Sequence, residues 1–133
     1  MLAPLLDTPF AFYGHSLGAL TAFEITRELR RRGMPNPTQL LISGCRAPQI
    51  VHAPSMRWKS DTDFLVTIEQ MYGGLPPAIR SDPEMMPFFL RVLRADFALL
   101  ESYLYNSEEP LAAPLHIFGG TDDTHVHRRH LEA

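Results

Sequence analysis

The stretch FAFYGHSLGALTAFEITRELRRRG, residues 10–33, contains an apolar run, a glycine-serine turn and an amphipathic helical pattern in immediate succession. Residues 10–13 are apolar without alternation, which is typical of a strand buried on both faces. A helix is expected from about Ser16 to Arg32, with arginines near its negative C-terminal end and Gly33 as its stop. This order predicts a strand, a tight turn and a crossover helix of an α/β sheet.

Two further apolar runs predict parallel partners for the first strand. Residues 39–44, QLLISG, follow the helix after a loop with two prolines, and residues 114–120, PLHIFGG, come near the end of the chain. Strands joined by right-handed crossovers form a parallel sheet. We therefore expect an α/β fold with three parallel strands and flanking helices.

The segment between the second and third predicted strands has helical periodicity. One helix is expected over DTDFLVTIEQMYGG, with Asp61 as N-cap and Gly73 as stop. A longer helix is expected from Pro87 to Tyr105, or from an earlier start that places Pro87 in its first turn. Asp96 falls on the apolar side of this helix, so we expect a buried carboxylate that anchors the helix through hydrogen bonds, with a role in substrate binding as the alternative.

The composition argues against several classes of protein. With 12 basic and 15 acidic residues, the chain has a formal charge of −3 and lacks the basic excess of a nucleic-acid surface or a polybasic membrane patch. The single cysteine, Cys45, excludes an internal disulfide and a cysteine-based zinc site. No run approaches the roughly 20 apolar residues of a membrane span. We expect a cytoplasmic protein without a metal, whose partner is a small molecule or another protein.

Gly14-His15-Ser16-Leu17-Gly18 is a G-x-S-x-G motif between a predicted strand and a predicted helix, the context in which it forms the nucleophile elbow of a serine hydrolase. The turn holds its serine in a sparsely allowed conformation, and we expect both glycines to remove side chains that would collide across it. The N–H of Leu17 is a candidate oxyanion donor. His15 is expected to pack, because adjacent side chains on such a turn diverge. A chance glycine-serine turn is the alternative.

The acid and the base are expected later in the chain, in that order. Asp122 and Asp123 follow the third predicted strand at the sheet edge that carries Ser16, so one of them is a candidate acid; a loop turn or helix cap is the alternative. Three histidines between His125 and His130 lie on the acid's own loop, and surface roles are expected for them. Their clustering suggests metal binding, but the surrounding residues do not form a known metal-binding motif.

Four blocks of the sequence resemble the type II thioesterases, the free-standing α/β-hydrolases associated with nonribosomal peptide and polyketide synthases. These blocks are the opening stretch, LLISGCRAPQ, MYGGLPPAIRSDPEMMPFFLRVLRADFALLESY and PLHIFGGTDD, of which SGCRAP and LRADF are more specific than G-x-S-x-G. The resemblance implies Ser16 as nucleophile, Asp123 as triad acid and the Leu17 amide as half of the oxyanion hole. It also implies an enzyme of antibiotic-type biosynthesis that hydrolyses acyl or aminoacyl thioesters on an acyl or peptidyl carrier protein. The substrate itself carries the phosphopantetheine, so no cofactor is expected.

The resemblance further implies one partial α/β-hydrolase domain over residues 1–133, with a helical lid insertion at about 46–90. Met71, Met85 and Met86 are expected on the lid's substrate surface, because methionine-rich surfaces adapt to varied acyl chains; a core position under the long helix is the equal alternative. Relative to the family, the early strands and the segment with the catalytic histidine are missing, so we expect a piece truncated at both ends. Another esterase or lipase of this fold, or an incomplete fragment that only binds acyl groups or a carrier protein, are the alternative functions.

Overall fold

The structure is a computed structural model that describes residues 6–50 and 55–132. The chain forms two compact units, the first made of residues 1–51 and 105–133 and the second of residues 52–104. The second unit is therefore an insertion between the second and third strands of the first. It begins six residues later and ends 14 residues later than the expected lid at about 46–90. Its action as a lid stays a prediction.

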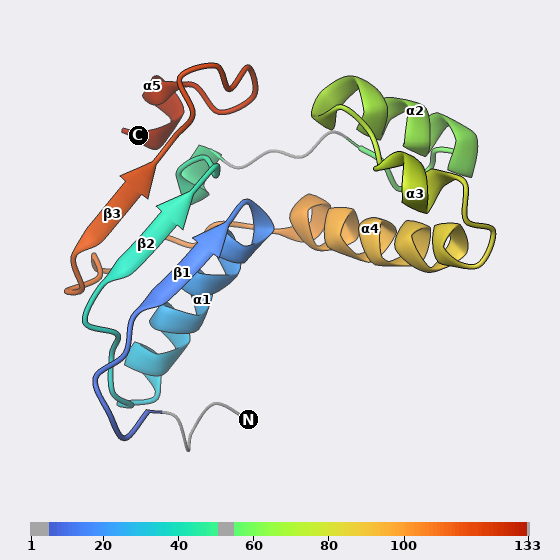
Figure 1. Cartoon of the computed structure of the whole chain (residues 1–133). Coiled ribbons are helices and arrows are strands. Elements are labelled where there is room, and N and C mark those ends of the chain that lie inside the picture. The colour runs from blue at the N-terminus through green and yellow to red at the C-terminus, as the bar shows by residue number, and fades with distance from the viewer. Residues whose placement is uncertain (1–5, 51–54, 133) are drawn as a thin grey trace. The chain divides into compact units, whose positions relative to one another are not determined.

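The first unit contains a parallel sheet of three strands in the order β1-β2-β3 (Figure 1). The strands are β1 (Phe12–His15), β2 (Leu40–Ser43) and β3 (Leu115–Phe118). Their last residues are paired in register, so all three strands end level at one edge of the sheet. The predicted three-stranded parallel arrangement is confirmed. The first strand lies two residues later than expected, because its pairing with β2 continues into the glycine-serine motif.

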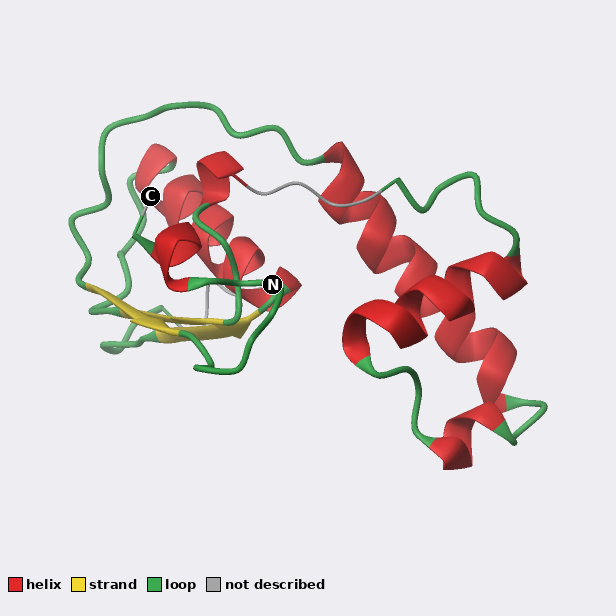
Figure 2. Cartoon of the chain, turned by 90° about the horizontal axis from the view of Figure 1, so that it is seen from above, coloured by secondary structure: helices red, strands yellow, loops and turns green. Residues whose placement is uncertain are grey.

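Helix α1 (Leu17–Arg31) covers one face of this sheet, and Figure 2 shows the sheet edge-on with the helices of the unit on that side. The helix buries Ala19, Leu20 and Leu29. As predicted, it stops before Gly33, which has a φ of 61°. The 3₁₀ turn η2 (Pro48–Ile50) and the short helix α5 (Arg128–Leu131) complete the unit. On the opposite face of the sheet, Tyr13 is 68% exposed and Phe118 is 51% exposed.

An arginine cluster ties the segment before β3 to α1. The carboxylate of Glu108 accepts from Arg27 at 2.7 Å, from Arg30 at 2.6 Å and from Arg31 at 2.7 Å. The Arg27 side chain is only 4% exposed, so its charge depends on this partner and on Glu24, 2.8 Å away. The cluster fixes where the chain returns from the second unit to the sheet.

This cluster predicts an acid-dependent loss of stability. The hydrogen bond from Arg27, followed by those from Arg30 and Arg31, lowers the pKa of Glu108 from its ordinary 4.5. A carboxylate with a lowered folded-state pKa contributes stability that is complete above the unfolded pKa and is lost as the pH falls through the folded pKa. In Glu108→Gln, the free energy of unfolding should therefore change less with pH below about 4.5.

Urea unfolding followed by circular dichroism at a series of pH values from about 3 to about 7 measures this dependence. Glu109→Gln is the matched control, because Glu109 offers Arg30 its backbone carbonyl rather than its carboxylate. Equal pH dependence in the wild type and Glu108→Gln would contradict the prediction.

The described residues 55–104 of the second unit form three helices: α2 (Asp61–Tyr72), α3 (Pro77–Arg80) and α4 (Met85–Ser102). The N-cap of α2 is Ser60, whose hydroxyl accepts the Asp63 N–H at 3.1 Å, so the prediction of Asp61 as cap is wrong. The Asp61 carboxylate instead pairs with Arg94 at 2.6 Å. Gly73 ends α2 with a φ of 76°, as predicted, and α4 begins early enough to hold Pro87 in its first turn.

A small apolar core holds these helices together. It contains Met56, Phe64, Ile68 and Phe97, and the two phenylalanine rings meet edge to face with centroids 5.6 Å apart. The three methionines expected on the lid surface lie outside this cluster: Met71 and Met86 are half-buried and Met85 is 42% exposed. The described residues include no helix that is long and apolar enough to cross a bilayer.

Candidate active site

Ser16 occupies the turn between β1 and α1 in a strained backbone conformation. Its φ is 53° and its ψ is −120°, and it is the one non-glycine residue with a positive φ in the described part of the chain. The Ser16 N–H donates to the carbonyl of Ser43 at 2.9 Å, which fixes the turn to the end of β2. The Ser16 side chain is exposed and does not cap α1, so its hydroxyl is available to a ligand. Strain of this kind persists where the surroundings determine it and is concentrated at functional sites.

The two glycines of the motif, Gly14 and Gly18, differ in whether a side chain would fit at their position. A Cβ at Gly14 would lie 2.3 Å from the Gly18 carbonyl oxygen and 2.6 Å from the Ala19 Cα. Both are backbone atoms that cannot move aside, so the predicted collision is confirmed at Gly14. A Cβ at Gly18 would meet no described atom within 4 Å other than the backbone of its own helix. The prediction of a collision at Gly18 is therefore wrong, because this residue faces solvent in the first turn of α1.

His15 is directed toward the end of β2 and not toward Ser16. Its Nδ1 and the Ser43 Oγ are 3.2 Å apart and share a hydrogen bond. The ring also lies close to Gly44, where an added Cβ would be 2.6 Å from His15 Cε1. The His15 side chain therefore diverges from Ser16 as expected, but the residue is exposed, so its packing role stays a prediction.

Leu17 is the first residue of α1, at the end of the helix where backbone N–H groups have no carbonyl partner within the helix. The N–H groups of Ala19 and Leu20 donate to the Ser16 carbonyl at 3.0 Å and 3.4 Å. The positive end of the helix dipole thus lies directly beside the Ser16 hydroxyl. The expected role of the Leu17 amide in an oxyanion hole stays a prediction.

Asp123 is held in a fixed position beyond the end of β3. Its Oδ1 accepts the N–H groups of His125 at 2.8 Å and Val126 at 2.9 Å, and its own N–H donates to Gly120 at 3.3 Å. The bond from Val126, opposed by partial burial and aided by His125, lowers the pKa of Asp123, so the carboxylate is ionised at neutral pH. Asp122 is exposed, whereas Asp123 is half-buried. The structure therefore orients one of the two candidate acids.

The histidines around the acid do not contact Ser16 within the described residues. His127 and His130 cap the start of α5, where the His127 N–H donates to His130 Nδ1 at 3.2 Å. His52 lies outside the described residues. The described residues also contain no group of three or more histidine, cysteine, aspartate or glutamate side chains that could hold a metal ion. The structure thus brings Ser16 and Asp123 to one edge of the sheet without assigning their base.

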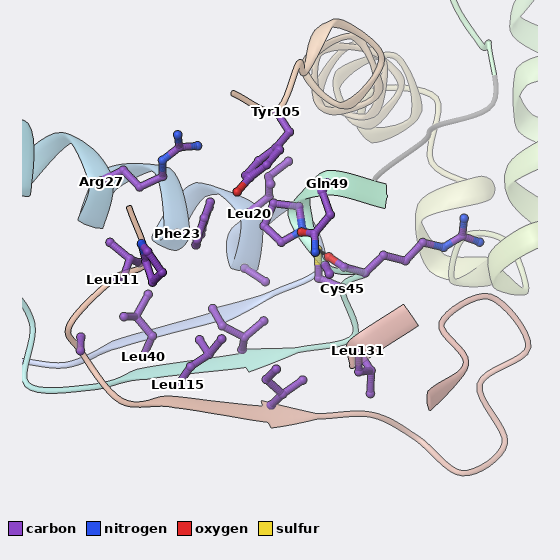
Figure 3. Close-up of a pocket in the computed structure, with 18 of the residues that line it drawn as sticks. Leu20, Phe23, Arg27, Leu40, Cys45, Gln49, Tyr105, Leu111, Leu115 and Leu131 are labelled. Atoms are coloured by element: carbon purple, nitrogen blue, oxygen red, sulfur yellow. Dashed lines mark hydrogen bonds between the residues drawn. The ribbon is translucent and has the colours of Figure 1, made fainter. Parts of the chain in front are cut away.

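A cavity of about 460 Å³ lies between α1 and the sheet (Figure 3). It lies among α1, strands β2 and β3, and the segment 105–113. Cys45 lines it as a free thiol, and burial raises the pKa of this thiol. The lining includes none of the predicted site residues. The cavity is therefore distinct from the surface onto which Ser16 opens.

This chain is similar to a family model, to curated relatives and to solved structures, and the three comparisons agree. The family model described as Thioesterase domain matches residues 1–132. The gramicidin S biosynthesis protein GrsT of Aneurinibacillus migulanus is 41% identical over 133 residues, which cover 99% of this chain and 52% of GrsT. The chain spans about half the length of the curated relatives it matches.

Solved structures also resemble this chain over about half of their own length. The RedJ thioesterase from the prodiginine pathway of Streptomyces coelicolor is 35% identical with a TM-score of 0.86, over 98% of this chain and 50% of RedJ. YbtT, a type II thioesterase from the yersiniabactin NRPS/PKS pathway, is 37% identical with a TM-score of 0.82, over 98% of this chain and 54% of YbtT. Both neighbours have the predicted α/β-hydrolase fold.

Proposed function

Since this chain belongs to the thioesterase domain family, we propose that it is the nucleophile-bearing part of a serine hydrolase that cleaves thioesters. The observation that carries this proposal is the conformation of Ser16. A serine at a φ of 53° and a ψ of −120°, between a parallel strand and the N-terminus of a helix, has the geometry of a nucleophile elbow. The collision at Gly14 shows that the turn is closed too tightly for an ordinary residue.

The residues at the sheet edge suggest how the reaction proceeds. The Ser16 hydroxyl attacks the thioester carbonyl and transfers its proton to a histidine, and the thiol leaves with a proton returned by that histidine. The Leu17 N–H stabilises the negative charge on the carbonyl oxygen. Asp123 orients the histidine: its Oδ1 is occupied by two backbone N–H groups, and Oδ2 accepts no hydrogen bond from the described residues. Water then attacks the acyl-enzyme and releases the acid.

The relatives suggest the substrate class. GrsT, RedJ and YbtT are named for biosynthetic pathways of gramicidin S, prodiginine and yersiniabactin. We propose that this chain acts on acyl or aminoacyl groups attached to the phosphopantetheine of a carrier protein. The inserted unit of residues 52–104 would form the lid, with Met71, Met85 and Met86 facing the acyl chain.

One observation favours a second function, binding of the acylated carrier protein without turnover. The Ser16 hydroxyl has no hydrogen-bond partner among the described residues, so the described part of the chain supplies no base to activate it. Without a base, a serine hydroxyl is a weak nucleophile at neutral pH.

Incubating the 133-residue chain with an acylated carrier protein, and separately with a matched oxygen ester, distinguishes these functions. In a protein that joins these residues to a segment supplying the histidine, we expect release of free acid from the carrier thioester and weaker release from the ester. In that protein, Asp123→Asn should lower turnover by about 10² to 10⁴-fold, because the supplied histidine loses the carboxylate that orients it. Asp122→Asn is the matched control and should retain turnover. Binding of the acylated carrier without hydrolysis would replace the proposal by the second function, and preferential cleavage of the oxygen ester would indicate an esterase.

A further inference from the structure

The turn that follows β2, residues 43–47 with the sequence SGCRA, contacts both candidate catalytic elements. On the nucleophile side, the Ser43 carbonyl accepts the Ser16 N–H at 2.9 Å, and the Ser43 hydroxyl shares a hydrogen bond with His15. Between the strands, the Gly44 N–H donates to the carbonyl of Phe118 at 3.1 Å. The sequence block that marks the family therefore begins at the base of the nucleophile turn.

The same turn also holds the loop that carries Asp123. The guanidinium group of Arg46 donates to the His125 carbonyl twice, from Nη2 at 2.8 Å and from Nε at 3.2 Å. The next residue, Ala47, donates its N–H to the carbonyl of His130 at 2.8 Å. These three bonds join the turn after β2 to the acid loop and to α5, about 80 residues away in the sequence.

The His125 carbonyl belongs to the same peptide group as the Val126 N–H. That N–H donates to Asp123 Oδ1 at 2.9 Å. A trans peptide group is planar, and its C=O and N–H point in opposite directions. Arg46 and Asp123 therefore bind opposite edges of one rigid peptide group. A hydrogen bond at the carbonyl also polarises the peptide and strengthens the bond that its N–H donates.

We propose that Arg46 is a positioning residue, which acts through the 125–126 peptide to fix the orientation of the Asp123 carboxylate. This inference rests on the proposed role of Asp123 as the acid. It assigns a function to the arginine of SGCRAP, a block for which the sequence alone suggested none.

Two effects of Arg46 have to be separated. Arg46 carries a positive charge near the acid loop, and so do His125 and His127 when protonated; both histidines contribute to the lowered pKa of Asp123. Burial, followed by the charge of Arg46, lowers the pKa of His130 in α5, which follows the acid loop. Arg46→Lys keeps the charge but loses the planar fork that bonds twice to one carbonyl. Arg46→Ala removes both.

The test uses the full chain and needs no turnover. The pKa of Asp123 is followed by ¹³C NMR of its carboxyl carbon, and hydrogen exchange is measured at the Val126 amide. In Arg46→Ala the Asp123 pKa should rise by about one unit and Val126 exchange should accelerate about tenfold, because the 125–126 peptide is no longer fixed. Arg46→Lys should give a smaller change in the same direction. Arg94→Ala is the matched control, since Arg94 holds the Lys59 carbonyl in the other unit at 2.9 Å, and it should leave both values unchanged.

An unchanged Asp123 pKa and unchanged Val126 exchange in a folded Arg46→Ala protein would overturn the proposal. If Arg46→Ala does not fold, Arg46→Lys decides: wild-type values would show that charge alone matters and would overturn it, whereas a raised pKa with faster exchange would support it. The outcome is separate from the proposed function, because an Asp123→Asn variant with full turnover would remove the acid role and leave the link between Arg46 and Asp123 intact.

Discussion

Replacing Ser16 by glycine is expected to make the protein more stable and to abolish thioester hydrolysis. The wild-type serine is held at a φ of 53° and a ψ of −120°, a region that side chains disfavour. Relief of this strain amounts to about 1–3 kcal/mol. The extra conformational entropy of glycine in the unfolded chain offsets about 0.5–1 kcal/mol of it. The net gain in the free energy of unfolding should be about 1 kcal/mol.

Ser16→Ala is the control that separates strain from chemistry. It lacks the nucleophilic hydroxyl but keeps the Cβ, so its free energy of unfolding should stay within about 0.5 kcal/mol of the wild type. Turnover should fall by about 10⁴-fold or more in both variants, because each lacks the nucleophile. Denaturant unfolding and carrier-thioester hydrolysis measure the two effects. A Ser16→Gly protein no more stable than Ser16→Ala would show that the turn does not strain its serine.

Strong local signals made the sheet and α1 predictable from the sequence. The apolar runs have strand length, Gly33 marks the end of the helix, and the G-x-S-x-G motif requires a strand before it and a helix after it. The shift of β1 by two residues has a tertiary cause. Pairing with β2 extends the strand to His15, opposite Ser43, and no local pattern reports that register.

Details that depend on competing side chains were less predictable. Ser60 and Asp61 are adjacent cap formers, and the pairing of Asp61 with Arg94, distant in sequence, leaves the cap to Ser60. Asp96 was expected to be a buried, hydrogen-bonded anchor. It is half-buried, and its carboxylate makes no hydrogen bond or ion pair with a described residue. Phe97 is the only residue of α4 that is fully buried. The wide apolar stripe of α4 therefore predicted more burial than the helix has.

The candidate site, too, was only partly predictable from the sequence. Composition and spacing placed Ser16 and two candidate acids at one edge of the sheet, but they left Asp122 and Asp123 equivalent. The distinction comes from the backbone N–H groups of residues 125 and 126, which any residue other than proline would supply there. The contacts of Arg46 with the His125 carbonyl join loops that no sequence period relates.

The larger effect on stability is expected at Gly14. Gly14→Ala would place a Cβ 2.3 Å from the Gly18 carbonyl oxygen, 2.5 Å from the Gly18 carbonyl carbon and 2.6 Å from the Ala19 Cα. All three atoms belong to the backbone of α1, so the helix must move away from β1 or the turn must open. We expect a loss of about 3 kcal/mol or more in the free energy of unfolding, at the upper end of overpacking substitutions.

Gly18→Ala is the matched substitution within the same motif. Its Cβ would meet no described atom within 4 Å beyond its own helix, and alanine is the better helix former, so this variant should be up to about 1 kcal/mol more stable than the wild type. The pair therefore predicts opposite signs for the same chemical change at two glycines of one turn. Denaturant unfolding of both variants measures the difference. Equal effects at the two positions would mean that the close approach of β1 to α1 at Gly14 does not determine the shape of the turn.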